Sequence, residues 1–191
     1  MLLRLIDDIR NALDNDCLFS ALSLALTLPD ICGKAEYPKA AVGKRYIDWY
    51  DKHVGITERP MVNGLIPEGL EDMPYLSGEV VFNLRCCYLH QGTPNIEKRK
   101  IKEECCKIDH FILLSEKKNH FDSYGDTATV SYGVPFSRDG NKYRSYTVSI
   151  RRLCLILTAC AKGYYQENKE KFNFFKYSIV EEQTTQNEYI D

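Results

Sequence analysis

One apolar segment near the start of the chain constrains the fold more than any other feature. From residue 18 to residue 26 the chain carries Leu18, Leu22, Leu24, Ala25 and Leu26, and few polar side chains interrupt them. A helix that is apolar nearly all round is buried, either in the middle of a domain or at a subunit interface. The segment therefore predicts a central helix that leaves little surface for water.

Other segments supply amphipathic helices that could cover it. Apolar residues recur at helical spacing over residues 2–14, over 39–54 up to Gly55, and in a long segment that follows Ser149. Residues 28–38 contain Pro29, Gly33 and Pro38 and are expected to form a short turn or 3₁₀ segment, and residues 56–76 an irregular connection. We expect a mainly α-helical bundle forming a single domain over residues 1–174, followed by a polar tail over 175–191.

The chain changes character between about residues 109 and 148. Residues 110–114, 127–132 and 143–148 have the composition and alternation of strands, and Asp139-Gly140 is a turn signal before the last of them. We expect a small antiparallel β-hairpin or sheet, inserted into the helical domain.

The segment from Ser77 to Gly92 predicts a helix with clear ends. Ser77 can cap its first turn, and Glu79 suits the positive end of the helix dipole. Gly92 is a typical C-terminal stop, and Pro94 follows it. An apolar stripe from Val80 to Tyr88 predicts that one side of this helix packs on the core.

Arg85 and His90 near the end of this helix form the strongest candidate for a catalytic pair. Five residues at about 100° each place the two side chains about 140° apart, so they share a broad face if Arg85 bends toward His90. Histidine can remove a proton from a ribose 2′-hydroxyl near neutral pH. Arginine can hold a phosphate through two parallel hydrogen bonds. Together they would cleave RNA without a metal ion.

A simpler interpretation stands beside the catalytic one. Arg85 would pair with a surface acid, and His90 would interact with the C-terminal end of the helix. The same two alternatives apply to three polar residues after the buried helix, Asp30, Lys34 and Glu36. They either support the site, with Asp30 orienting Arg85 or His90, or form a turn cap and a surface pair.

The Arg-x4-His arrangement in a small helical domain with an apolar N-terminal helical pair resembles the HEPN superfamily. Members are helical, commonly dimeric, and often act as ribonucleases in toxin–antitoxin and anti-phage systems. Arg85 and His90 match the two defining positions, and Cys86 stands where members often have asparagine. The resemblance implies a metal-independent ribonuclease or RNA-binding module that forms a homodimer, with RNA as ligand and an antitoxin as candidate partner.

The chain also resembles, over most of its length, a group of uncharacterised bacterial proteins. That similarity includes segments like Leu28-Pro29-Asp30-Ile31-Cys32-Gly33 and the stretch from Leu84 to Gly92. Some HEPN-like domains are inactive, so a non-catalytic dimeric interaction or scaffold protein is the alternative function.

Doubled cysteines offer a further alternative. Cys86 and His90, with Cys106 and His110, each have a spacing of four, which on a helix places both side chains on one face. Four such ligands would hold one zinc ion tetrahedrally. His90 would then be a zinc ligand and not a general base, so the zinc-stabilised helical domain competes with the nuclease.

Charge and hydropathy limit the remaining functions. A formal net charge of -2 argues against a chain built to coat nucleic acid, so any RNA contact must be local. The start of the chain is acidic and unlike a signal peptide, and the apolar stretches look too short for a membrane span. We therefore expect a cytoplasmic protein with reduced cysteines and no membrane partner.

Overall fold

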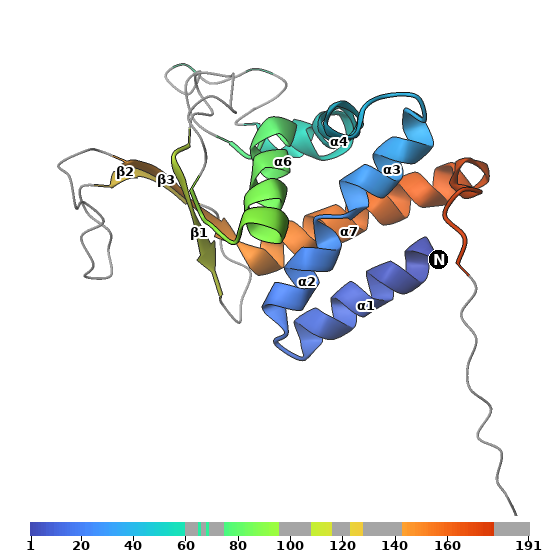
Figure 1. Cartoon of the computed structure of the whole chain (residues 1–191), viewed down its shortest axis with the longest axis horizontal. Coiled ribbons are helices and arrows are strands. Elements are labelled where there is room, and N and C mark those ends of the chain that lie inside the picture. Colours follow the sequence, from blue (N-terminus) through green and yellow to red (C-terminus); the bar gives the residue numbers. More distant parts are fainter. Residues whose placement is uncertain are drawn as a thin grey trace, which may run out of the picture.

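The computed structural model describes residues 1–59, 65, 68, 75–95, 108–115, 123–127 and 143–177. The α-helices are α1 (Leu2–Asp14), α2 (Leu18–Ala25), α3 (Leu28–Glu36), α4 (Val42–Tyr50), α5 (Ile56–Glu58), α6 (Gly78–Cys86) and α7 (Ile150–Glu167). Two π-helical turns, η1 (Asp51–Gly55) and η2 (Cys87–Gln91), continue α4 and α6, and the 3₁₀ turn η4 (Lys169–Phe172) follows α7. The predicted mainly helical fold is confirmed, and Figure 1 shows a small sheet at one end of the helices.

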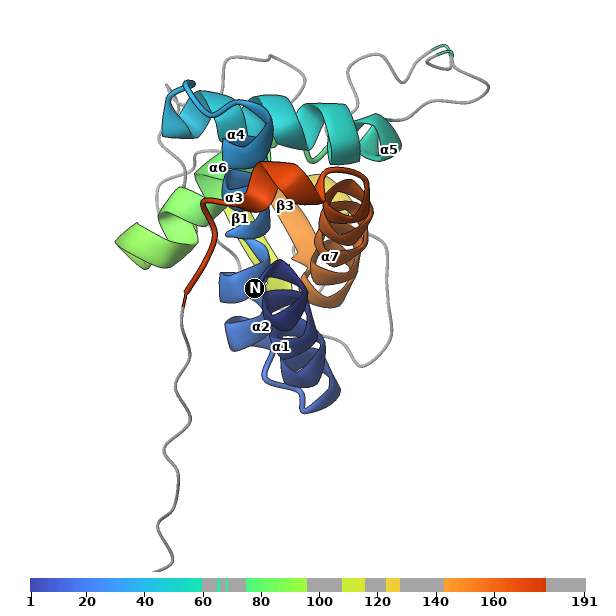
Figure 2. The same ribbon diagram turned by 90° about the vertical axis from the view of Figure 1, so that its right-hand side faces the viewer.

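The apolar segment forms α2, and one side of α2 is buried within the chain while Phe19 on the other side is exposed. Ala21, Leu22, Ala25 and Leu26 have no exposed surface. Helices α1 and α7 contact α2 and each other, and the three lie close together in Figures 1 and 2. The burial of this helix therefore needs no second subunit.

Residues 28–36 form a helix, so the expected turn is wrong. Pro29 lies in the first turn of α3, where a missing N–H costs no helical hydrogen bond. Gly33 lies where α3 meets α4, and a Cβ there would overlap the carbonyl oxygen of Arg45. The glycine thus permits a close approach of two backbones and does not interrupt the helix.

The helix that starts at Val42 does not stop at Gly55 as expected. It continues through the π-helical turn η1 into α5, which ends at Glu58. Arg152 on α7 donates from its Nη2 atom to both carboxylate oxygens of Glu58, at 2.8 and 2.9 Å. This contact between distant parts of the chain holds the extra turn in place.

The sheet contains β1 (His110–Leu114), β2 (Ser123–Thr127) and β3 (Tyr143–Ser149), with β3 in the middle. Strand β2 pairs antiparallel with β3, but β1 pairs parallel with it, from His110 opposite Ser145 to Leu114 opposite Ser149. The expected antiparallel insertion is therefore wrong for the β1–β3 pair. Strand β2 follows β1 in the sequence but pairs with the opposite side of β3. The chain therefore reaches β3 from β1 by a crossover, which a parallel pair requires, and not by a tight hairpin turn.

The expected strand over 127–132 meets β2 only at Thr127, and residues 128–132 lie outside the described residues. The tail predicted over 175–191 is described only as far as Tyr177. The long helix after Ser149 is confirmed, and the Ser149 hydroxyl accepts a hydrogen bond from the Arg152 amide at its start (3.3 Å).

By length and composition, the 19-residue stretch Leu18–Glu36 is apolar enough to cross a membrane. This differs from the expectation that every apolar stretch is too short. In the folded chain 56% of the most apolar window of this stretch is buried, and no membrane location follows from its length and composition alone. The cytoplasmic location stays a prediction.

Candidate functional site

Helix α6 carries the predicted catalytic arginine, and two side chains fix its beginning. The Ser77 hydroxyl accepts a hydrogen bond from the Val80 amide (3.3 Å), which confirms the predicted cap. The Asp51 carboxylate, from η1, accepts a second from the Gly78 amide (2.6 Å). Gly78 has no side chain because a Cβ would lie 2.7 Å from the Ile47 carbonyl oxygen on α4. Helix α6 is thus held firmly against α4.

The π-helical turn η2 determines where His90 lies. In such a turn the backbone hydrogen bonds join residues five apart, so each residue rotates the chain by less than the 100° of an α-helix. The Gly92 amide donates to the Cys87 carbonyl in this pattern, and Gly92 has the left-handed φ of 61°. His90 therefore lies closer to Arg85 than the 140° of a regular helix predicts.

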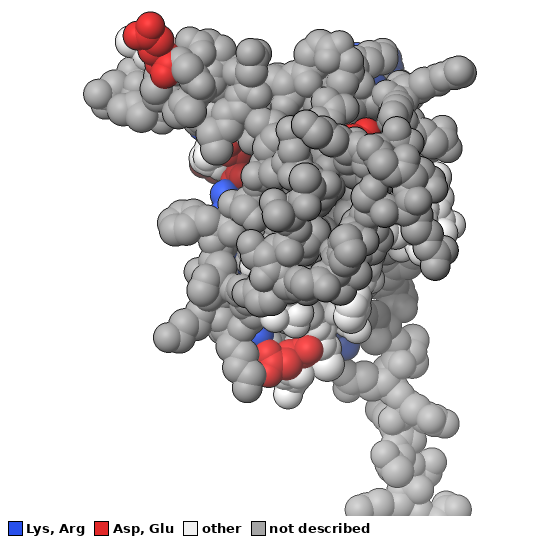
Figure 3. Space-filling model, turned by 90° about the vertical axis from the view of Figure 1, so that its left-hand side faces the viewer, with Lys and Arg blue, Asp and Glu red and all other residues white. Residues whose placement is uncertain are grey.

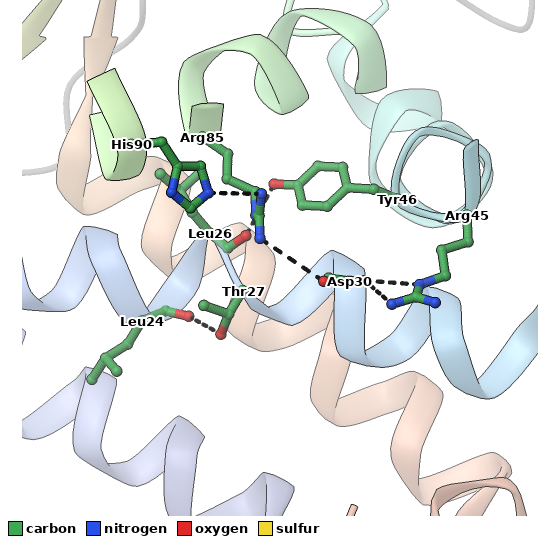
Figure 4. Close-up of polar contacts among 8 residues, drawn as sticks. All are labelled: Leu24, Leu26, Thr27, Asp30, Arg45, Tyr46, Arg85 and His90. Atoms are coloured by element: carbon green, nitrogen blue, oxygen red, sulfur yellow. Dashed lines mark hydrogen bonds and ion pairs between the residues drawn. The ribbon is translucent and has the colours of Figure 1, made fainter. Parts of the chain in front are cut away.

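Arg85 and His90 meet as predicted, with Arg85 Nη1 3.5 Å from His90 Nε2 (Figure 4). That distance is at the outer limit of a hydrogen bond. The His90 ring is exposed to solvent, whereas the Arg85 side chain is only 16% exposed. One small ligand could therefore contact both side chains from the solvent side.

The Arg85 guanidinium is only partly neutralised by its surroundings. The nearest carboxylate oxygen described is Asp30 Oδ2, 3.9 Å from Nη2. The Cζ atom of Arg85 lies 5.9 Å from the centre of the Tyr46 ring, a cation–π contact. Among the described residues, no group accepts a hydrogen bond from the buried Nε. A desolvated cation without a close anion favours binding of one.

Asp30 is bound mainly by a different arginine. The Arg45 Nε and Nη2 atoms, from α4, lie 2.8 and 2.7 Å from the same oxygen, Asp30 Oδ1. Both side chains are largely buried. Below them Tyr46 has no exposed surface and donates its hydroxyl hydrogen to the Leu26 carbonyl (3.2 Å). Burial raises the pKa of Tyr46 far above its ordinary value, which keeps this donor protonated.

We call Asp30, Arg45, Tyr46, Arg85 and His90 the arginine–histidine site. Sequence spacing identified Asp30, Arg85 and His90 as candidates, and the structure brings these three together. Sequence spacing did not identify Arg45, which lies 15 residues from Asp30. It also indicated no role for Tyr46 beyond packing in the core. A charged residue within the predicted helix over 39–54 was the only available signal for Arg45.

The other two predicted supporting residues lie elsewhere. The Lys34 ammonium donates to the Pro38 carbonyl (2.8 Å) and closes the end of α3. Glu36 pairs with Lys52 and with His53 Nε2, the latter at 2.8 Å. His53 in turn stacks on Trp49, with ring centres 5.0 Å apart. Lys34 and Glu36 therefore have structural contacts of their own, apart from Arg85.

The zinc alternative gains no support from the residues that can be described. Across those ranges no three His, Cys, Asp or Glu side chains are placed to share a metal ion. Cys106, one of the four predicted ligands, lies outside the described residues. His110 is on β1, where its Nδ1 lies 2.9 Å from Asn95 Oδ1, while Cys86 and His90 belong to α6 and η2.

A separate apolar pocket of about 250 Å³ lies between the end of α6 and β1. It is lined by Leu84, Cys87, Tyr88, Gly92, Thr93, Pro94, Phe111 and Leu113. None of the five residues of the arginine–histidine site lines it, so it is not part of that site.

The surface seen in Figure 3 carries isolated acidic and basic side chains over its described part. The expectation that any contact with nucleic acid is local rests on the net charge of -2.

Comparisons with protein-family models, curated proteins and solved structures find no match to this chain.

Proposed function

We propose that the arginine–histidine site binds and cleaves RNA without a metal ion, as a HEPN-like ribonuclease. One observation carries the proposal. The Arg85 guanidinium is mostly buried, is incompletely neutralised, and lies 3.5 Å from the exposed ring of His90. This combination pairs an anion-binding group with a general base within reach of one nucleotide.

The reaction needs only these two groups. His90 removes the proton of a ribose 2′-hydroxyl, and the 2′-oxygen attacks the adjacent phosphorus. The bond from phosphorus to the 5′-oxygen breaks, and that oxygen takes a proton from the imidazolium or from water. Arg85 binds the phosphate oxygens and stabilises the charge that develops on them. The products are a 2′,3′-cyclic phosphate and a free 5′-hydroxyl.

The proposal extends to a homodimer, in which a two-fold axis would bring two such pairs into one cleft. An antitoxin partner and a role in a toxin–antitoxin or phage-defence system follow from the family resemblance alone. Cys86, in place of the family's asparagine, cannot donate an amide hydrogen bond to the phosphate. The Arg85 fork must then supply that contact.

The test is cleavage of a labelled single-stranded RNA in excess chelator by the wild-type chain and by His90→Ala. Loss of the general base is expected to lower the rate by about 10²- to 10⁴-fold. Arg85→Lys keeps the charge but loses the planar fork, so it should also be slow. His110→Gln is the matched control, because His110 is outside the site, and it should cleave at the wild-type rate.

Equal cleavage by wild type and His90→Ala would contradict the mechanism. RNA binding that depends on Arg85 without any cleavage would leave an RNA-binding module. Neither binding nor cleavage would favour the alternative, a non-catalytic interaction or scaffold protein.

A further inference from the structure

The charges of the arginine–histidine site leave one positive charge for a ligand. Arg45 and Arg85 are both cations, and Asp30 is the only carboxylate that contacts either of them in the part of the chain described. With a neutral His90, two positive charges and one negative charge remain. A singly charged anion would neutralise this count, whereas a doubly charged anion would leave the site with an excess negative charge.

Asp30 divides its interaction unequally between the two arginines. Both short contacts, at 2.7 and 2.8 Å, join Arg45 to Oδ1, whereas Arg85 is 3.9 Å from Oδ2. Asp30 is thus engaged by Arg45 and cannot also neutralise Arg85 fully. Arg45 keeps Asp30 in place, and Asp30 offsets the charge of Arg45.

The position of this pair is fixed by the backbone beneath it. Arg45 lies on α4 beside Gly33 of α3, where the two helices are in backbone contact. The side chains of Asp30 and Arg45 are 23% and 16% exposed, so water screens their charges only partly. A change of one charge at the pair should therefore be felt by a ligand bound to Arg85.

RNA offers two kinds of phosphate that differ in charge. An internal phosphodiester carries one negative charge, whereas a terminal phosphomonoester has a second pKa of about 6 and carries two at pH 8. We propose that the Asp30–Arg45 pair sets the charge of the site so that it selects the internal phosphodiester over a terminal phosphate. This inference rests on the proposed function, because it assumes that Arg85 binds phosphate.

The test compares two probes at pH 8. One is a dinucleoside monophosphate with a 2′-O-methyl group, which cannot be cleaved and has one charge. The other is the matching nucleoside 3′-monophosphate. The quantity measured is the ratio of their dissociation constants in wild type, Asp30→Asn, Arg45→Met and the double variant D30N/R45M.

The ratio should follow the charge of the site. Asp30→Asn removes one negative charge, so the net charge of the site rises by one, and it should shift the preference about tenfold toward the monophosphate, a change of 1.4 kcal/mol. Arg45→Met removes one charge and should shift it the other way. The double variant restores the wild-type charge and should restore the ratio to within about twofold. Lys44→Met is the control, because it removes the same charge from a side chain that is 70% exposed.

A ratio that is unchanged in all variants, with binding abolished by Arg85→Met, would overturn the inference but leave the phosphate-binding role of Arg85 intact. Equal binding by wild type and Arg85→Met would overturn both. If Arg45→Met alone does not fold, as judged by circular dichroism, the comparison of Asp30→Asn with the double variant still decides the question.

Discussion

Two carboxylates of α3 serve different parts of the molecule. Asp30 contacts the arginines of the arginine–histidine site, and Glu36 contacts Lys52 and His53. Six residues on a helix turn the side chain by about 600°, so the two lie about 120° apart. The three residues that the sequence grouped as one supporting set therefore separate as soon as residues 28–36 become a helix.

Glu36 should make the stability of the protein depend on acid. Burial raises the pKa of Glu36, but the hydrogen bonds from Lys52 and His53 and their charges together lower it by more than burial raises it. The pKa of Glu36 in the folded chain is therefore below its ordinary value. The unfolded chain then takes up a proton first as the pH falls. This stabilisation is present above about pH 4.5 and is lost as the pH falls through the folded pKa.

The prediction is a shallower loss of stability below pH 4.5 in Glu36→Gln than in wild type, measured by urea unfolding at several pH values. Glu36→Gln should also be less stable at pH 7. Glu167→Gln, an exposed position at the end of α7, is the control. Parallel curves for wild type and Glu36→Gln would contradict the assignment.

At the scale of elements, two π-helical turns place the side chains that matter. Turn η1 carries Asp51, which caps α6, and η2 carries His90 to Arg85. A π-helical turn inserts a residue into a helix and rotates everything beyond it, and such turns often occur at functional sites. Apolar periodicity does not reveal them, because the apolar stripes on either side remain helical.

The contact between α3 and α4 depends on Gly33. Gly33→Ala should lower the free energy of unfolding by about 1–3 kcal/mol, because the added methyl group overlaps the Arg45 carbonyl. Gly163→Ala on α7 is the matched control, since a Cβ there has no described atom within 4 Å. Its helix should gain up to about 1 kcal/mol. Denaturant unfolding measures both, and equal effects would contradict the close approach.

Elements with a one-sided apolar pattern or a capping residue could be predicted from the sequence. The spacing of Ile6, Ile9 and Leu13 predicted α1, and Ser77 and Ser149 predicted where α6 and α7 begin. Pro29 and Gly33 led to the wrong prediction of a turn, because both residue types occur in helices as well as in turns. Proline is also a good residue at the first turn of a helix, and glycine also permits close packing. For Gly33, only the position of α4 shows that the glycine permits close packing and does not end the helix.

At the scale of the whole molecule, the order of strands depended on contacts that no local pattern contains. The sequence predicted β1 and most of β3, but not that they pair in parallel. In the same way, Arg85 and His90 could be found from their spacing, whereas Arg45 could not. Its partner Asp30 is 15 residues away and belongs to another helix.

The ion pair between Arg152 and Glu58 joins the first turn of α7 to the end of α5. The Glu58 side chain is 4% exposed, so removing Arg152 takes two hydrogen bonds away from a buried carboxylate. Arg152→Met should lower the free energy of unfolding by about 3–5 kcal/mol. The double variant R152M/E58L should lose less, because the buried carboxylate that Arg152 neutralises is removed with it. Guanidinium unfolding measures both, and an equal loss in the two variants would contradict this explanation.

The homodimer stays a prediction, but its original basis has changed. The buried side of the apolar helix that suggested a subunit interface is covered by α1 and α7 of the same chain. A dimer would have to use exposed apolar side chains, such as Leu3 on α1 and Phe19 on the uncovered side of α2, which are 41% and 65% exposed.

The backbone contact at Gly33 also has a consequence for motion. Two helices that touch through a carbonyl oxygen and a Cα atom have no soft side chains between them to absorb a displacement. Helices α3 and α4 should therefore move as one rigid body that carries Asp30, Arg45 and Tyr46. Any adjustment to a bound ligand would then come from the other side of the site, where a single glycine-ended turn carries His90.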